Sequence, residues 1–222
     1  MIEIDKALPK DQRILLAAED VFCRRGYAQA TVDEIIALAD TGKGTVYKYF
    51  GSKDNLFYTL VAGKIEPFLE RLRAIATSSQ DTKAKIHSYM LELLSFLRVN
   101  RDLYRILWYE VSGNDRGLHL VFLKDGTWEM NSHYGDTLQE VEYTRLLRYR
   151  NLIKEEVLCL ITIISEGMDN KFMKCGQATI TAHHLFGGVT MSVLHYVGQP
   201  EFTDDELADL IVDRFLYGHA AR

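Results

Sequence analysis

The chain has 222 residues, which fits one long domain or a small domain followed by a larger one. Hydrophobic residues make up 47% of it and charged residues 26%, a composition that excludes a disordered or collagen-like chain. The net charge of −5 argues against a general nucleic-acid binder, and only three prolines leave room for long helices.

The cysteines and the apolar runs bear on the cellular compartment. Cys23, Cys159 and Cys175 lie far apart and form no Cys-x-x-Cys pair, so they predict neither a disulfide framework nor a zinc site. The opening stretch 1–13 lacks the apolar run of a signal peptide. The longest apolar run, 157–164, is too short to span a bilayer, which needs ~20 residues. We therefore expect a soluble, cytoplasmic protein with no membrane partner.

Helical spacing dominates the first 50 residues. An apolar stripe runs from Lys10 to Arg25 and ends at Gly26, a residue suited to the left-handed conformation at a helix end. The segment 31–34, Thr-Val-Asp-Glu, is a capping box that opens a second short helix. After a break at 40–42, helical spacing resumes over 43–50. Two short helices joined by a turn of about three residues are typical of a helix-turn-helix motif.

The rest of the chain keeps helical spacing almost throughout. Ser52 is a candidate N-cap for a long helix to about Ala76, which Pro67 should kink near 65–66. We expect that this kink helps to transmit an effector signal. Apolar stripes predict further helices over 86–97, 103–111, 138–168, 178–197 and 203–217, the last opened by a second capping box.

Residues 113–137 are the exception, and two interpretations of them stay open. The segment can form a β-hairpin with a two-residue turn at Asp125-Gly126. In that register Val121 and Leu123 share a face with Trp128 and Met130. The alternative is an irregular loop before the next helix.

The second helix of a helix-turn-helix motif lies in the major groove of DNA. At its start in this chain, Lys43 supplies a cation, Gly44 a backbone that can approach closely, and Thr45 a hydroxyl. Lys53 and the amides after Ser52 would meet a neighbouring phosphate at a helix N-terminus. Polar side-chain tips one turn into the helix come from Tyr47, Lys48 and Tyr49.

Several fixed spacings between about residues 10 and 60 occur together. They are the pattern Ala18, Phe22, Gly26, Tyr27, then Thr31-Val-x-x-Ile35, Ala37-x-Ala39, Lys43-Gly-Thr-Val-Tyr-x-Tyr-Phe50 and Ser52-Lys53-x-x-Leu56. This combination resembles the N-terminal domain of the TetR family of bacterial transcriptional regulators.

The resemblance implies an all-α, two-domain homodimer. It places a helix-turn-helix DNA-binding domain at 1–51 and a helical effector-binding and dimerisation domain at 52–222. The last two helices, about 178–197 and 203–217, would pair with those of the partner. The residues that the resemblance places against DNA are Thr31, Lys43, Thr45, Tyr47, Lys48, Tyr49 and Lys53, and Gly44 joins them as a point of close backbone approach.

One departure from the family pattern falls in the turn of the motif. The usual Gly-Val-Ser is replaced here by Asp40-Thr41-Gly42. Asp tolerates the left-handed conformation better than most residues, and Gly is an acceptable N-cap. Thr41 stands where a buried apolar residue is usual, so we expect a looser turn.

Enzymatic alternatives find little support in the sequence. The segment 41–45 resembles the end of a phosphate-binding loop, but Ala37 stands where that loop needs Gly, Gly44 stands where it needs Ser or Thr, and a helix precedes it instead of a strand. His183 and His184 are adjacent, which makes them poor co-ligands for a metal. We expect no catalysis, metal or cofactor. A protein-interaction module with a degenerate DNA-binding head is the alternative function.

These observations lead to one working hypothesis, a ligand-responsive regulator, most often a repressor in this family, that binds a near-palindromic DNA operator as a homodimer. A small-molecule effector would sit among the helices between about 81 and 168 and shift the balance between two dimer geometries. The candidate pocket residues are Phe96, Tyr104, Trp108 and Tyr143, although Tyr104 and Trp108 also fit a plain hydrophobic core.

Overall fold

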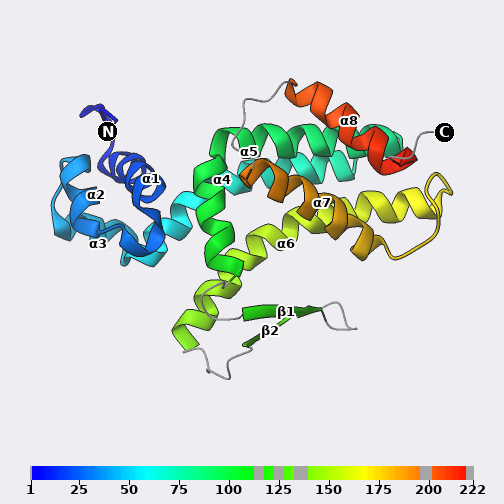
Figure 1. Ribbon diagram of the computed structural model, residues 1–222. Coiled ribbons are helices and arrows are strands. Elements are labelled where there is room, and N and C mark those ends of the chain that lie inside the picture. Colours follow the sequence, from blue (N-terminus) through cyan, green and yellow to red (C-terminus); the bar gives the residue numbers. More distant parts are fainter. Residues whose placement is uncertain (1, 113–117, 123–127, 133–139, 196–201, 219–222) are drawn as a thin grey trace. The chain divides into compact units, whose positions relative to one another are not determined.

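The computed structural model describes residues 2–112, 118–122, 128–132, 140–195 and 202–218. In this part of the chain the elements are α1 (Lys10–Gln29), α2 (Val32–Ala39), α3 (Lys43–Phe50), α4 (Lys53–Ala76), α5 (Thr82–Ser112), β1 (Leu118–Phe122), β2 (Trp128–Ser132), α6 (Glu140–Asp169), α7 (Ala178–His195) and α8 (Asp204–Tyr217). The predicted all-α class with a small hairpin insert is thus confirmed (Figure 1).

The elements form two compact units. The first contains residues 1–63 and 102–151, and the second contains 64–101 and 152–222. Helices α4, α5 and α6 contribute residues to both units.

The first three helices pack into a small bundle at the N-terminal end of the first unit (Figure 1). The regular part of α1 ends at Gly26. Its φ of 74° is positive, as in the expected left-handed conformation, but its ψ of 167° lies outside the left-handed helical region. The predicted capping box of α2 is confirmed, with the Thr31 hydroxyl accepting the Glu34 amide proton. The core side chains of this bundle are Ile14, Ala17, Ala18, Val21, Phe22, Ile35, Ala39, Val46 and Phe50.

The turn between α2 and α3 has the conformation that its sequence predicted. Asp40 adopts the left-handed region, with φ 49° and ψ 56°. Its carboxylate lies 2.8 Å from Lys6 Nζ, and the hydrogen bond to Lys6 holds the pKa of Asp40 below its ordinary value. Gly42 is the N-cap of α3 and makes no side-chain capping bond. The departure from the family pattern therefore preserves the two-helix geometry.

Thr41 is expected to cost the turn some stability. Within the described residues its buried Oγ1 has no hydrogen-bond partner, and a buried unpaired hydroxyl costs roughly 1–3 kcal/mol. Thr41→Val keeps the shape and removes the hydroxyl, so we expect the free energy of unfolding to rise by about 1 kcal/mol. Urea unfolding of both proteins tests this, with Thr59→Val, on the exposed face of α4, as the control. A Thr41→Val protein no more stable than the native chain would show that the hydroxyl is solvated.

The hairpin exists, but its predicted register is wrong by one residue. Strands β1 and β2 are antiparallel, with Phe122 opposite Trp128 and Leu120 opposite Met130. The predicted turn would have paired Leu123 with Trp128 instead. A shift of one residue exchanges the two faces of a strand.

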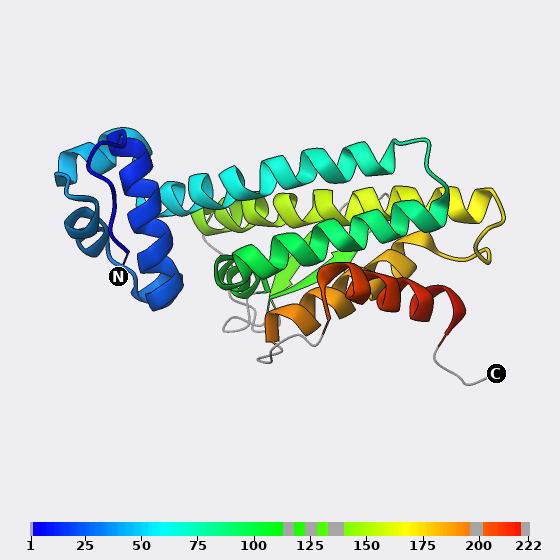
Figure 2. The same ribbon diagram turned by 90° about the horizontal axis from the view of Figure 1, so that it is seen from above.

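The second unit is built from the later part of α4, the first part of α5, the later part of α6, and α7 and α8. Helices α4, α5 and α6 run side by side there (Figures 1 and 2). The rings of Phe68 and Phe96 stack with centroids 4.2 Å apart and join α4 to α5. Helix α5 departs from helical geometry at Asn100, whose side-chain amide donates to the Phe96 carbonyl oxygen over 3.0 Å. Helix α4 contains Pro67, and its kink stays a prediction.

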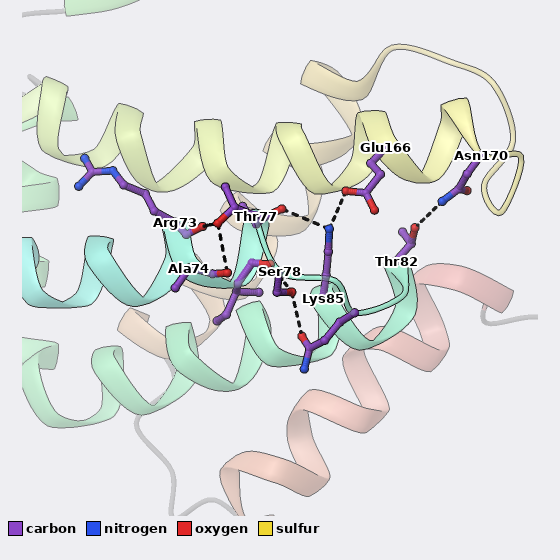
Figure 3. A network of polar contacts seen from close by, with 11 residues as sticks. Arg73, Ala74, Thr77, Ser78, Thr82, Lys85, Glu166 and Asn170 are labelled. Atoms are coloured by element: carbon purple, nitrogen blue, oxygen red, sulfur yellow. Dashed lines mark hydrogen bonds and ion pairs between the residues drawn. The ribbon is translucent and has the colours of Figure 1, made fainter.

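A polar network fixes the turn between α4 and α5 against the end of α6 (Figure 3). The Lys85 side chain is only 4% exposed, and its ammonium lies 2.7 Å from a Glu166 carboxylate oxygen and 3.3 Å from the Ala76 carbonyl oxygen. Asn170 donates a further hydrogen bond to the Thr82 hydroxyl over 3.0 Å. Gly167 lies so close that a β-carbon there would come within 2.6 Å of the Thr82 methyl group. This corner therefore combines a buried charge with a close helix–helix approach.

Helix α8 is joined to α5 by charged side chains. The Asp204 carboxylate forms an ion pair with the Arg98 guanidinium at 2.6 Å and accepts a hydrogen bond from the Ser95 hydroxyl over 3.1 Å. The predicted second capping box is confirmed, with Thr203 and Glu206 exchanging hydrogen bonds.

The capping box of α8 makes a pH-dependent contribution to stability. The backbone N–H of Thr203 holds the pKa of the Glu206 carboxyl below its ordinary value. The stabilisation is therefore full above the ordinary carboxyl pKa, about 4.3, and is lost as pH falls through the lower folded value. We expect Thr203→Ala to lower the melting temperature at pH 7 and to lower it less at pH 3. Thermal melts from pH 7 to pH 3 test this, and a constant difference between the two proteins would contradict it.

Candidate nucleic-acid interface

Helix α3 has one side buried in the bundle and the other side exposed to solvent. Val46 and Phe50 are in the core of the bundle, while Tyr47 and Tyr49 are 44% and 51% exposed. Thr45 is half-buried. The remaining exposed candidates on this helix are Lys43, Gly44 and Lys48. The structure thus brings the predicted helix residues together on one short, accessible helix.

The charges of this helix are available to an anion. The segment 41–53 contains three lysines and no acidic residue. Lys43 Nζ lies 3.3 Å from the Asp33 carboxylate, but both side chains are more than half exposed. An exposed ion pair of this kind contributes little, so a phosphate can replace the carboxylate.

Lys53 is held differently from the other candidate lysines. Its ammonium donates to the Ala28 carbonyl oxygen over 3.2 Å and lies 4.7 Å from the centre of the Tyr27 ring. Burial lowers the pKa of Lys53 below its ordinary value. The side chain thus closes the end of α1 against the start of α4, and contact with a phosphate would require the ammonium to leave Ala28.

Thr31 is exposed and serves as the cap of α2. Its hydroxyl donates to the Glu34 carboxylate over 3.1 Å and accepts the Glu34 amide proton over 3.2 Å. The start of α4 is capped in a related way, because Ser52 Oγ accepts the Asn55 amide proton over 3.0 Å. The exposed N-termini of both helices carry the partial positive charge that suits a phosphate.

The sequence did not reveal a polar cluster around the first turn of α4. The Tyr149 hydroxyl donates to Asp54 Oδ1 over 2.6 Å, and Arg148 donates to Asn55 Oδ1 over 3.1 Å. Arg145 lies over the Tyr27 ring at 5.2 Å. These partners are far apart along the chain, and no local pattern signals them.

The candidate effector residues differ in how deeply they are buried. Phe96 and Tyr104 are buried, and Trp108 is half-buried. The side chain of Tyr143 lies outside the described residues. The pocket that these four were predicted to line stays a prediction. A separate open hollow of about 680 Å³ lies along α6, lined by Ile161, Thr162, Ser165, Glu166, Asp169 and Asn170.

The described residues offer neither of two further possibilities, a metal site and a membrane-spanning helix. They contain no group of three or more His, Cys, Asp or Glu side chains that could hold a metal ion. None of the described helices combines the length and the apolar character needed to cross a bilayer.

The sequence of the N-terminal bundle matches a known family. Residues 14–59 match the model of the bacterial regulatory proteins of the tetR family. The HTH-type transcriptional activator FasR of Mycolicibacterium smegmatis is 27% identical over 104 residues, which are 46% of this chain and 48% of FasR. The fatty acid metabolism regulator protein of Bacillus subtilis is 30% identical over 95 residues, 43% of this chain and 49% of the relative. The matched part therefore spans about half the length of each relative.

Solved structures share the fold over nearly the whole chain. The transcriptional regulator FadR from Bacillus subtilis, in complex with stearoyl-CoA, superposes with a TM-score of 0.70 at 19% identity, covering 94% of this chain and 99% of that one. The TetR family regulator PfmR from Thermus thermophilus gives 0.72 at 14% identity, covering 94% and 100%. At these identities the likeness shows the fold alone.

Proposed function

We propose that this chain is a transcriptional regulator of the TetR family, whose model residues 14–59 match, and that its α3 helix binds a near-palindromic DNA operator. Two copies of the chain would place two α3 helices in successive major grooves, about 34 Å apart. In this proposal the protein is a repressor, and a small-molecule effector lowers its affinity for DNA.

One observation supports this function above the others. Helix α3 presents hydroxyl and ammonium groups on a single exposed face, while its opposite face is fixed in the core by Val46 and Phe50. A rigid helix with exposed polar tips is what base and phosphate contacts in a groove require.

Selection of genomic DNA fragments by the purified protein tests the proposal. The best fragment is then titrated at about 50 and about 200 mM salt. Saturable binding to a near-palindrome that weakens steeply with salt supports the regulator, because phosphate contacts release counterions. Failure to enrich any sequence, with and without candidate effectors, would contradict it and favour the protein-interaction module.

The proposed homodimer is supported by apolar side chains on the last two helices. Ile180 and Met191 on α7 are 54% and 41% exposed, and Leu210 on α8 is 38% exposed. In the proposed dimer the partner would cover these apolar side chains and remove them from water.

A charge on this apolar surface should prevent pairing. We expect Ile180→Asp to raise the dimer dissociation constant at least about 100-fold, because a carboxylate would be desolvated in an apolar interface. Sedimentation equilibrium of both proteins measures this. The control is Val99→Asp, at a position on α5 that is 83% exposed. An Ile180→Asp protein that pairs as well as the control would place the interface elsewhere.

The effector class is proposed from the relatives. FadR was crystallised with stearoyl-CoA, and a curated relative is a fatty acid metabolism regulator. We therefore propose a long-chain acyl thioester as the effector of this chain. Operator titrations with stearoyl-CoA, with coenzyme A and with stearate distinguish recognition of the thioester from recognition of either part. Equal affinity for DNA in all three would exclude this effector class.

A further inference from the structure

Three side chains of α6 contact the first turn of α4 within the first unit. The Tyr149 side chain is fully buried, and its hydroxyl donates to Asp54 Oδ1 over 2.6 Å. Burial and the Asp54 carboxylate raise the pKa of Tyr149 far above its ordinary value, so the hydroxyl keeps its proton. The Tyr149 ring meets the Phe57 ring edge to face, with centroids 5.6 Å apart. Helix α6 is thus joined to α4 by a charge-assisted hydrogen bond inside an aromatic cluster.

Arg148 reaches the end of α3 through one intermediate residue. Its guanidinium donates to Asn55 Oδ1 over 3.1 Å and lies 3.9 Å from the centre of the Tyr58 ring. The side-chain amide nitrogen of Asn55, Nδ2, in turn donates to the Phe50 carbonyl oxygen over 2.9 Å. Phe50 is the last residue of α3. Two hydrogen bonds therefore connect α6 to the C-terminus of the helix that we assign to DNA.

Arg145 extends this connection to α1 and α5. It lies 3.2 Å from the Glu110 carboxylate, 4.0 Å from Asp54 Oδ1, and over the Tyr27 ring at 5.2 Å. The Tyr27 hydroxyl also donates to Asp54 Oδ1, over 3.4 Å. The Asp54 carboxylate thus accepts contacts from α1 and α6 at once.

Most of the core of the bundle comes from α1, α2 and α3 themselves. Ile14, Ile35 and Val46 are buried there, and Phe22 also meets the Phe57 ring of α4 edge to face, with centroids 5.0 Å apart. Losing the contacts from α6 should therefore change how firmly α3 is held and leave the bundle folded.

We propose that Arg148 is a positioning residue for DNA binding, which acts through Asn55 on the C-terminus of α3 without touching DNA. Tyr149 supports the same corner through Asp54. This inference rests on the proposed DNA-binding function. It identifies the α6 side chains through which a change in that helix would reach α3.

The test compares Arg148→Met with Arg105→Met. Both variants remove one guanidinium from the first unit, but Arg105 pairs only with Asp102 on its own helix among the contacts described. We expect Arg148→Met to weaken operator binding about tenfold, with an unchanged dependence on salt and unchanged thermal unfolding of the bundle. Asn55→Ala should weaken binding similarly, and the double variant should be no worse than Asn55→Ala.

Each other outcome overturns the inference. An Arg148→Met protein that binds like Arg105→Met shows that the connection does not position α3. A shallower salt dependence shows that Arg148 contacts a phosphate itself. Additive losses in the double variant show that Arg148 and Asn55 act independently.

A measurement without DNA separates this inference from the proposed function. The Gly51 amide donates to the Tyr47 carbonyl oxygen at the end of α3, over 2.9 Å. Hydrogen exchange there should be several-fold faster in Arg148→Met and in Tyr149→Phe than in Arg105→Met. If the native chain binds no DNA but exchange responds in this way, the function fails and the connection stands. Unchanged exchange overturns the connection.

Discussion

Replacing Tyr47 by alanine should weaken operator binding by about two orders of magnitude. A side chain that contacts the nucleic acid contributes about 1–3 kcal/mol, and a homodimer loses the contact twice. Tyr47 is 44% exposed on α3 and lies outside the core of the bundle, so the loss should come without unfolding. Fluorescence anisotropy with the selected operator measures the affinity, and thermal melts confirm the fold.

Lys48→Ala provides a second measure of the same surface. Each lysine that neutralises a phosphate contributes about one to the slope of log affinity against log salt, so a dimer should lose about two. The matched control is Lys174→Ala, which removes the same charge from an exposed position after α6. If Lys48→Ala and Lys174→Ala reduce the salt slope equally and Tyr47→Ala keeps the native affinity for the operator, α3 does not contact DNA.

Glu166→Gln should lower the free energy of unfolding by about 2 kcal/mol. Removing one partner of a fully buried ion pair costs roughly 3–5 kcal/mol, because the other charge stays buried. The expected loss is smaller here, since the Glu166 side chain is 42% exposed while that of Lys85 is 4% exposed. The Ala76 carbonyl oxygen also continues to accept from Lys85. Urea unfolding followed by circular dichroism gives the value.

Two further variants assign that loss to the buried ammonium. Glu155→Gln breaks an ion pair with Arg73 in which both side chains are about half exposed, and it should cost at most about 0.5 kcal/mol. The double variant Lys85→Met with Glu166→Gln removes both charges and should recover most of the stability. If Glu166→Gln and Glu155→Gln cost the same, the burial of Lys85 has no energetic consequence.

The position of Lys53 changes how a variant there is interpreted. Because its ammonium contacts Ala28 and Tyr27, Lys53→Ala would remove an internal contact as well as any phosphate contact. Tyr47 and Lys48, which are exposed on α3, give cleaner tests of DNA binding.

Local sequence patterns predicted the features that depend on neighbours along the chain. The capping boxes at Thr31 and Thr203 and the positive φ at Gly26 all occur as expected. Each arises from a few consecutive residues, because helix ends must satisfy their own amides and carbonyl oxygens. The helix-turn-helix motif followed from such local signals.

Only the tertiary structure decided the features that join distant segments. Phe122 lies opposite Trp128, one residue away from the register that the Asp125-Gly126 signal predicted. The partners Arg148 and Asn55 are 93 residues apart, and Lys85 and Glu166 are 81 apart. A charged side chain on an amphipathic helix looks the same in sequence whether it faces water or a buried partner, because its environment is set by which helices pack together. For that reason the sequence predicted α3 and the residue types on it, whereas the packing of α6 decided which side chains Arg148 and Lys85 contact.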